Sequence, residues 1–246
     1  MPHRLGVATE GPMRIHKFLA TAGVCSRREA ERLVAEGKVT VNGRPASVGQ
    51  PVDPAVDQVR CHGQLVKSVA RRIILLMNKP RGYLCTNLDS HGGQTVFELV
   101  PPEYEAFRLF CVGRLDKDSE GMLLLTNDGE LANRVMHPSG GVIKRYEVTL
   151  NRDYDPALTP RLLKGAVEEG ERLRFRKVIR LPDHPAHLEV HLDQGRKREI
   201  RRLFEIFGFH VRTLRRFQMG ALVMKRMPPG DCRPLSVKEI GMLFDE

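Results

Sequence analysis

The sequence contains no tryptophan and only 6% aromatic residues. This scarcity leaves little for stacking sugars, so it counts against a glycosidase, although Asp116 and Asp118 could form the pair of carboxylates that glycosidases use. No apolar run approaches the length of a membrane span, and residues 1–12 lack the apolar core of a signal peptide. We therefore expect a cytoplasmic protein that does not contact a membrane.

The chain also lacks the cysteine patterns of disulfide-rich and zinc-binding proteins. Its cysteines are widely spaced and form no C-x-x-C pair, so neither a disulfide framework nor a thiolate zinc site is indicated. A P-loop and a dinucleotide-binding fingerprint are missing too, so we expect no cofactor. The five cysteines are Cys25, Cys61, Cys85, Cys111 and Cys232.

One polar alternation could suggest a metal site. His187, Glu189, His191 and Asp193 alternate with apolar residues, and the first two supply the H-x-E half of the zinc deaminase pattern. The P-C-x-x-C half of that pattern is absent. A solvated strand face explains the alternation more simply, so we expect no metal ion here.

Positive charge, by contrast, is in excess. The chain has 40 Lys and Arg residues against 30 Asp and Glu residues, a formal net charge of +10. Such a surplus favours a polyanionic partner, of which nucleic acid is the most common. The length of 246 residues and the apolar content of 41% allow one large domain or two smaller ones with real cores.

Residues 109–128 have the most informative pattern. Two apolar runs, Leu109–Val112 and Met122–Leu125, are typical of buried strands and flank a polar turn. Arg114 and Asp116 then lie at a strand end, near a core in which an unused carboxylate would be costly. Taken alone, this pattern fits either a surface turn with an incidental ion pair or a catalytic carboxylate.

The same segment resembles the signature of the bacterial ribosomal pseudouridine synthases, in the branch that includes the RsuA and RluB enzymes. The matching residues are Gly113-Arg114-Leu115-Asp116, Ser119, Gly121 and Thr126-Asn127-Asp128. The resemblance implies that Asp116 is the catalytic residue and that Arg114 fills the gap left by a flipped base. Whether Asp116 attacks C1′ or the uracil ring stays open.

Two later segments extend the resemblance. Alternation predicts a strand over residues 144–150, and Tyr146 on it corresponds to the family tyrosine that stacks on the target uracil; without the resemblance, a core tyrosine would be the simpler interpretation. Residues 195–203 resemble the family's third motif, which assigns to Arg201 the ion pair with the catalytic Asp and to Leu203 the packing beneath the site. A nearby cation would favour the charged form of that carboxylate. The pair Arg198-Glu199 departs from the neutral pair of many relatives, which we expect to affect RNA contacts.

The N-terminal part resembles the S4 RNA-binding domain. Helical spacing from Ile15, a capping pattern over Ser26–Glu29 and a hairpin turn at Asn42-Gly43 predict two short helices followed by hairpins. Basic residues on the outer helix faces suit phosphate contacts without base reading, although a merely solvated face is the alternative. Together with the third motif, the expected RNA-binding residues are Arg14, Lys17, Arg27, Arg28, Arg32, Arg196, Lys197 and Arg198.

These observations predict an α+β protein. We expect a flexible tail over residues 1–12, an S4-like RNA-binding domain over 13–66 and a linker over 67–72. Residues 73–246 should form a pseudouridine synthase domain, built on a mostly antiparallel β-sheet with flanking helices, and the middle of residues 151–171 should be helical.

The expected partner is ribosomal RNA or a pre-ribosomal particle, and we expect the protein to be a monomer. Loop residues 79–82, 85–86 and 94–97 and the segment 131–138 look closer to the large-subunit RluB-like branch, so we expect a uridine of 23S ribosomal RNA as the target. A 16S ribosomal RNA pseudouridine synthase and a non-catalytic S4-type RNA-binding protein are the alternatives.

Overall fold

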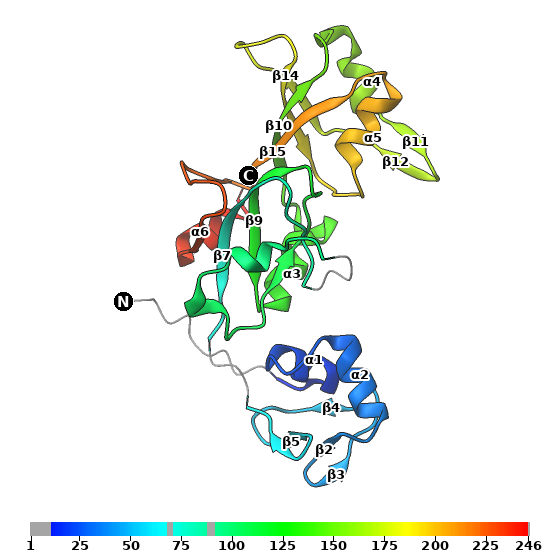
Figure 1. Cartoon of the computed structure of the whole chain (residues 1–246). Coiled ribbons are helices and arrows are strands. Elements are labelled where there is room, and N and C mark those ends of the chain that lie inside the picture. Colours follow the sequence, from blue (N-terminus) through cyan, green and yellow to red (C-terminus); the bar gives the residue numbers. More distant parts are fainter. Residues whose placement is uncertain (1–10, 68–70, 88–91, 246) are drawn as a thin grey trace. The chain divides into compact units, whose positions relative to one another are not determined.

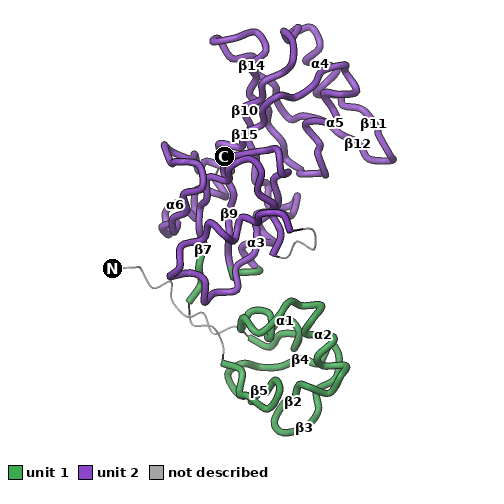
Figure 2. The backbone as a smooth tube through the Cα atoms, viewed as in Figure 1, with its two compact units in different colours: residues 1–73, 127–129 green, residues 74–126, 130–246 purple. Residues whose placement is uncertain are grey.

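The computed structural model describes residues 11–67, 71–87 and 92–245. The chain divides into two compact units (Figure 1, Figure 2), one of residues 1–73 with 127–129 and one of residues 74–126 with 130–246. Most of the expected tail, residues 1–10, and the middle of the expected linker, residues 68–70, lie outside the described residues. In the parts of the chain that the structure describes, no helix is long and apolar enough to cross a membrane.

The smaller unit consists of two helices and short hairpins around one apolar core. Helices α1 (Ile15–Thr21) and α2 (Arg27–Ala35) each bury one face. A four-stranded antiparallel sheet has the order β3-β2-β5-β6, and β1 pairs with β4. The strands are β1 (Met13–Arg14), β2 (Val39–Val41), β3 (Arg44–Pro45), β4 (Pro51–Val52), β5 (Val59–Cys61) and β6 (Gln64–Leu65).

Local sequence signals account for this unit. The Ser26 hydroxyl accepts a hydrogen bond from the Glu29 amide at 3.2 Å, which caps the start of α2. Asn42 and Gly43 have φ angles of 51° and 78°, as the two-residue turn between β2 and β3 requires. The predicted helix cap and the predicted hairpin turn are both confirmed.

The larger unit is built on a nine-stranded sheet with the order β13-β14-β10-β15-β9-β7-β17, to which β16 adds beside β15 and β8 beside β9. Every pairing in it except β15 with β9 is antiparallel, so the predicted α+β architecture is confirmed. The strands are β7 (Ile74–Lys79), β8 (Phe110–Val112), β9 (Glu120–Thr126), β10 (Lys144–Leu150), β13 (Lys177–Arg180), β14 (His187–Leu192), β15 (Val211–Met219), β16 (Leu222–Val223) and β17 (Cys232–Pro234).

Helices flank both halves of this sheet. Figure 1 shows α4 (Thr159–Lys164) and α5 (Glu199–Ile206) with the half made by β14, β10 and β15. Helices α3 (Gly129–Met136) and α6 (Val237–Met242) accompany the half made by β9 and β7. Short 3-10 helices occur at η1 (Val96–Leu99), η2 (Pro102–Tyr104), η3 (Pro138–Gly140) and η4 (Pro156–Leu158).

The helix predicted within residues 151–171 is shorter than expected. Only η4 and α4 are helical, and Ala166 instead begins a hairpin of β11 (Ala166–Glu168) and β12 (Glu171–Leu173). Gly165 ends the helix with a φ of 79°, and a Cβ at this position would lie 2.1 Å from the Leu173 carbonyl oxygen. The apolar spacing continues past this glycine, but the helical backbone does not.

The single parallel pairing lies in the interior of the sheet. It joins β15 to β9 through Arg216 opposite Gly121 and Arg215 opposite Glu120. The two antiparallel halves of the sheet meet at this junction. Residues 113–119, which lead from β8 into β9, therefore lie where the halves meet.

Candidate functional site

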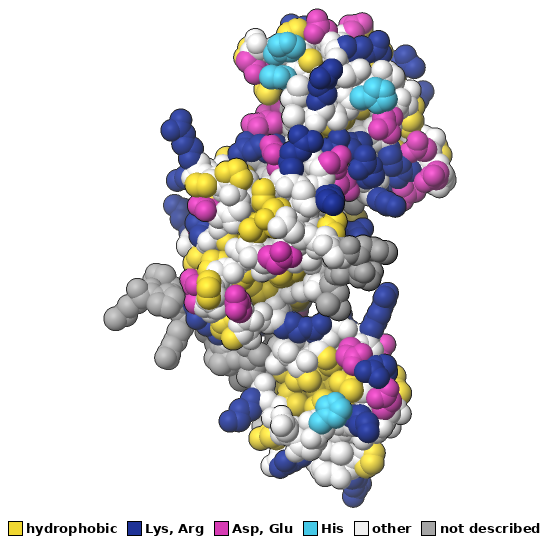
Figure 3. Space-filling model, in the orientation of Figure 1, with side chains coloured by type: hydrophobic (Ala, Val, Ile, Leu, Met, Phe, Trp, Pro, Cys, Tyr) yellow, Lys and Arg dark blue, Asp and Glu magenta, His cyan; other side chains and the backbone are white. Residues whose placement is uncertain are grey.

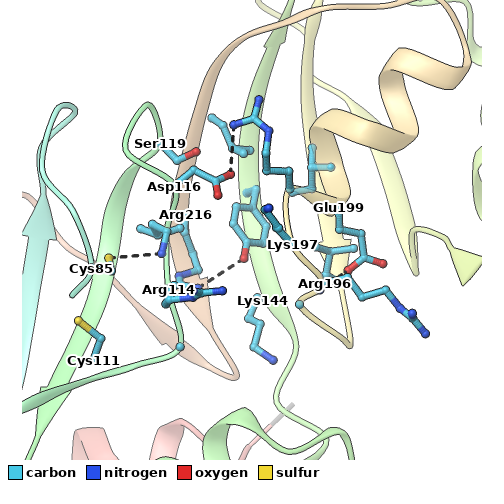
Figure 4. A pocket seen from close by; sticks show the side chains of 18 of the residues that line it. Cys85, Cys111, Arg114, Asp116, Ser119, Lys144, Arg196, Lys197, Glu199 and Arg216 are labelled. Atoms are coloured by element: carbon cyan, nitrogen blue, oxygen red, sulfur yellow. Dashed lines mark hydrogen bonds and ion pairs between the residues drawn. The ribbon is translucent and has the colours of Figure 1, made fainter. Parts of the chain in front are cut away.

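The loop of residues 113–119 places Asp116 at a cavity of about 700 Å³ (Figure 4). Leu115 belongs to the apolar core and anchors the loop from one side. The Ser119 amide donates to the Asp116 carbonyl at 3.0 Å and closes a tight turn. The Asp116 side chain stays 31% exposed at the cavity. Its backbone is therefore fixed while its carboxylate remains open to a ligand.

Lys79, at the end of β7, holds this loop from beneath. Its ammonium group is fully buried and donates to three carbonyl oxygens, those of Pro80 at 3.0 Å, Asp116 at 3.2 Å and Ser119 at 2.7 Å. Burial lowers the pKa of Lys79. A charged donor bound to backbone carbonyls stabilises the turn without occupying the Asp116 carboxylate. Lys79 therefore holds the Asp116 loop in place without itself lining the cavity.

The arginine beside Asp116 is not the one that the third motif indicated. Arg198 Nη1 lies 3.9 Å from the Asp116 carboxylate, whereas Arg201 forms an ion pair with Asp118 at 3.2 Å. Arg201 is only 5% exposed and also donates to the Val211 carbonyl at 2.8 Å, so its guanidinium points behind the loop. The expected ion pair of Arg201 with Asp116 is therefore corrected to one with Arg198.

Arg198 reaches the cavity because of its backbone. It has a left-handed conformation with φ 51° and precedes the first residue of α5, so it does not continue the outer face of that helix. Helical periodicity alone would place it among the outward-facing residues. It lies 3.6 Å from Asp118 as well, and bridges the two aspartates of the loop.

Tyr146 on β10 lines the cavity as expected of a residue that could meet a base. Its ring is mostly buried, and its hydroxyl accepts a weak hydrogen bond from Arg216 Nη1 at 3.5 Å. Leu203 is fully buried in the same apolar cluster as Tyr146 and does not line the cavity. The apolar lining beside Tyr146 instead includes Ile200 and Leu214.

Basic side chains surround the mouth of the cavity. Arg114, Arg196, Lys197 and Arg198 all line it, and all but the partly buried Arg196 are exposed. Figure 3 shows Lys and Arg side chains gathered in a band across the middle of the larger unit. Arg196 is partly neutralised by an ion pair with Glu171 at 3.3 Å. This rim is suited to contact a polyanion.

Two further cations in the cavity are not among the residues singled out from the sequence. Lys144 and Arg216 line it from β10 and β15, and both are buried. The signal for Lys144 is present in the sequence, because it shares the buried face of its strand with Tyr146 and Val148. Arg216 has no comparable signal, because the sequence shows it only as one of several basic residues close together.

The cavity also contains two cysteines to which the sequence pattern assigns no role. Cys85 and Cys111 line it, and the Cys111 thiol donates a hydrogen bond to Cys85. The amide of Leu115, next to Asp116, donates to the Cys85 sulfur at 3.5 Å. The hydrogen bond from Cys111, then that from Leu115, and the charge of Lys79 lower the pKa of Cys85, while the same pairing raises the pKa of Cys111.

The expected RNA-binding residues of the smaller unit are not equivalent. Arg14, Arg27 and Arg28 are exposed. Arg32 is exposed too, but its guanidinium forms ion pairs with Glu29 at 2.5 Å and Glu36 at 2.6 Å. These carboxylates raise the pKa of Arg32 and offset its charge. Lys17 is half-buried.

The two histidines of the polar alternation on β14 each contact a carboxylate. His187 contacts Asp183 at 2.8 Å and His191 contacts Glu189 at 2.5 Å. Within the described ranges, no cluster of three or more potential ligands suited to a metal ion occurs. The expectation of a solvated face was wrong for His191, which is buried.

Comparison with known proteins identifies the family. The family model described as RNA pseudouridylate synthase matches residues 73–205, and that of the S4 domain matches residues 13–57. An uncharacterized RNA pseudouridine synthase of Mycobacterium leprae is 39% identical over 96% of this chain and 94% of its own. The ribosomal large subunit pseudouridine synthase B of Vibrio cholerae is 37% identical over 94% of this chain and 74% of its own.

The fold agrees with these sequence matches. A crystal structure described as that of a pseudouridylate synthase matches with a TM-score of 0.68 and 25% identity, over 94% of this chain and 99% of its own. The chain belongs to the RNA pseudouridylate synthase family and carries an S4 domain. It is a pseudouridine synthase, an isomerase, as the resemblance predicted.

Proposed function

We propose that this enzyme isomerises one uridine of large-subunit ribosomal RNA to pseudouridine, with Asp116 as the catalytic carboxylate. One observation carries the assignment of Asp116. Within the described residues, the carboxylate accepts no hydrogen bond and has a single ion-pair partner, Arg198 at 3.9 Å. The Asp116 backbone, by contrast, is fixed, because its carbonyl oxygen accepts hydrogen bonds from the Lys79 ammonium group and from the Ser119 amide. The carboxylate oxygens are therefore available to a substrate in the cavity.

The other residues of the cavity suit a flipped nucleotide. Tyr146 offers an aromatic surface for the base, and stacking offsets part of the cost of taking a base out of its helix. Arg114 is exposed beside Asp116, where it can enter the gap that the base leaves. Arg196, Lys197 and Arg198 at the rim would bind phosphates. Arg201 supports the Asp116 loop through its hydrogen bond to the Asp118 carbonyl, and Leu203 supports Tyr146 by packing in the same apolar cluster.

The paired-carboxylate alternative has little support. Asp118 could serve as the second acid of a glycosidase, but its carboxylate is engaged by Arg201 at 3.2 Å and Arg198 at 3.6 Å. Isomerisation needs only one carboxylate. It breaks the N1–C1′ bond, turns the base, forms a C5–C1′ bond and moves a proton from C5 to N1.

Large-subunit ribosomal RNA is favoured as the target by the names of three relatives. The relatives in Pseudomonas aeruginosa, Haemophilus influenzae and Vibrio cholerae carry the name ribosomal large subunit pseudouridine synthase B. Proteins that read RNA sequence usually engage splayed loop bases, so we infer a uridine in a hairpin loop. A monomeric state and a cytoplasmic location stay predictions.

One experiment tests the enzyme, the residue and the target together. Pseudouridines are mapped across both ribosomal RNAs in a strain that lacks the gene, and again after complementation with the wild type or with Asp116→Asn. We expect one large-subunit pseudouridine to disappear, to return with the wild type and to stay absent with the variant, which keeps the size of the side chain but not its charge. Loss of a small-subunit site instead would refute the target, and restoration by Asp116→Asn would refute the catalytic role.

A further inference from the structure

Two buried cations form the floor of the cavity. Lys144 is 8% exposed and Arg216 is 3% exposed, and both line the cavity below the exposed basic rim. Figure 4 shows them with Asp116 around the same space. Such residues almost never lose their water without a compensating partner, because an unpaired charge in a low-dielectric interior is costly.

Their partners within the protein are incomplete. In the described residues, no hydrogen bond or ion pair reaches the Lys144 ammonium group. Arg216 donates from Nε to the Met122 carbonyl at 2.7 Å and from Nη1 to the Tyr146 hydroxyl at 3.5 Å, but its Nη2 is buried without a partner there. Neither cation contacts a carboxylate of the described chain.

The nearest carboxylates are used elsewhere. Glu199 accepts from the Gln194 side chain at 2.7 Å and from the Arg196 amide at 3.0 Å. Asp193 pairs with Arg174 at 3.4 Å and Arg176 at 3.8 Å. Burial, and then the charge of Arg216, lower the pKa of Lys144, while Asp193 and Glu199 act on it only from a distance. Lys144 and Arg216 are therefore two buried positive charges that no carboxylate of the described residues neutralises.

A β-bulge aims Arg216 at this floor. In the register of β10 with β15, Lys144 lies opposite Met219 and Tyr146 lies opposite Arg216, so Phe217 is an extra residue. Residues three apart on a regular strand point to opposite faces. The bulge lets Arg216 and Met219 both line the cavity, as re-aimed side chains beside active sites often do.

Because Lys144 and Arg216 are buried below the rim of the cavity, they would contact the base of a bound nucleotide and not its phosphates. The phosphates stay with the RNA backbone at the exposed rim, whereas a flipped base enters beside Tyr146. When the N1–C1′ bond breaks, its electron pair remains on uracil and is shared among N1, O2 and O4, and the electron-deficient sugar is left for the Asp116 carboxylate to stabilise. When the C5–C1′ bond forms, that pair returns to the sugar, C5 loses its proton and N1 gains one. The base is an anion only between these two steps.

We propose that Lys144 and Arg216 form a subsite that binds the detached uracil as its anion. This inference rests on the proposed function and adds to it the site at which the leaving group is held. Cations aimed at a charge that exists only during the reaction accelerate that reaction, since they stabilise the uncharged substrate far less.

Lys144→Met is the direct test, because methionine fills a similar volume without charge and no bond in the described residues depends on the ammonium group. Large-subunit RNA transcript is bound to excess enzyme and the single-turnover rate is measured. We expect a loss of about 100-fold or more, typical of removing one charge-stabilising donor, with RNA affinity unchanged. The melting temperature should rise, because an unpaired buried cation has been removed.

A second substrate separates anion binding from simple positioning. Fluorine at C5 withdraws electrons and stabilises the uracil anion by itself, so the Lys144→Met defect should shrink on RNA that carries 5-fluorouridine, measured as conversion to the rearranged nucleoside. Lys144→Arg should restore part of the rate on ordinary RNA. Lys177→Met, an exposed lysine on β13, is the matched control and should keep the wild-type rate.

Three results would overturn the subsite. They are a wild-type single-turnover rate for Lys144→Met, a weaker RNA affinity with an unchanged rate once bound, and an equal defect on uridine and 5-fluorouridine. The wild type and Asp116→Asn are assayed beside it and report on the proposed function. Activity of the wild type and inactivity of Asp116→Asn, together with any of the three results, would remove the subsite alone.

Discussion

At the scale of single residues, the protein holds the Asp116 loop by its backbone. Lys79 binds the carbonyls of Asp116 and Ser119, Arg201 donates to the Asp118 carbonyl at 3.3 Å, and the Leu115 amide donates to the Cys85 sulfur. None of these bonds uses the Asp116 carboxylate. A reactive group is best pre-organised when the residues around it carry the structural contacts and leave it free.

Cys85 should be the most reactive cysteine of the chain. The hydrogen bond from Cys111 and the nearby cations lower its pKa to about 6, whereas burial raises the pKa of Cys232 to about 12. The thiolate is the reactive form, so alkylation of Cys85 should reach half its maximum near pH 6 and level off above that pH, while an ordinary thiol reaches half its maximum only near about pH 8.5. Limited treatment with iodoacetamide followed by peptide mass spectrometry measures this.

Two variants show whether the Cys111 thiol is the cause. Cys111→Ala removes the hydrogen-bond donor and should move the alkylation midpoint of Cys85 upward. Cys111→Ser keeps a donor and should move it less. An unchanged midpoint in Cys111→Ala would contradict this explanation of the low pKa.

At the scale of secondary structure, the parallel contact of β9 with β15 explains a glycine of the signature. Gly121 has a φ of 102°, and a Cβ there would lie 2.2 Å from the Arg216 carbonyl oxygen. The strand that follows the Asp116 loop therefore approaches the strand of Arg216 too closely to leave room for a Cβ at position 121. Gly121 therefore permits the close pairing that places the end of the Asp116 loop beside Arg216.

Gly121→Ala should damage both stability and activity. The positive φ and the clash with backbone atoms together should lower the free energy of unfolding by at least about 2 kcal/mol, measured by urea denaturation. Gly141→Ala is the control, because Gly141 also has a positive φ of 68°, but no described atom lies within 4 Å of the point that its new methyl group would occupy. Equal losses for the two variants would show that backbone strain, and not the close approach of β9 to β15, sets the cost.

Periodicity predicted the elements well because it depends on neighbours along the chain. The alternation over residues 144–150 marked β10 and placed Tyr146 on its buried face, as observed. It could not show the bulge at Phe217, because that depends on the partner strand. Nor could it show that α5 begins only after Arg198, whose left-handed backbone decides which arginine meets Asp116.

At the scale of the whole molecule, the excess of positive charge is distributed over both compact units. The larger unit presents its basic rim around the cavity, and the smaller unit presents exposed arginines at Arg14, just before α1, and on α2. Composition predicted a polyanionic partner but not which of these cations are available. The ion pairs of Arg32 with Glu29 and Glu36, and of Arg202 with Glu168 and Glu171, show that many arginines serve the fold.

The exposed arginines of α2 should contribute to RNA affinity through phosphates. Arg27 and Arg28 have no ion pair within the described residues, so replacing both with glutamine removes two uncompensated charges. If each contacts one phosphate, the slope of log affinity against log salt should fall by about 1.4 to 1.8, with little preference among RNA sequences. Titration of the full-length variant with ribosomal RNA between low and high salt measures this.

The control is Arg60→Gln on β5, outside the two helices, for which we expect an unchanged slope. A fall of about 0.7 to 0.9 for Arg60→Gln, half that of the double variant, would show that the smaller unit contributes only its overall charge. An unchanged slope for the double variant would remove α2 from the RNA-binding surface.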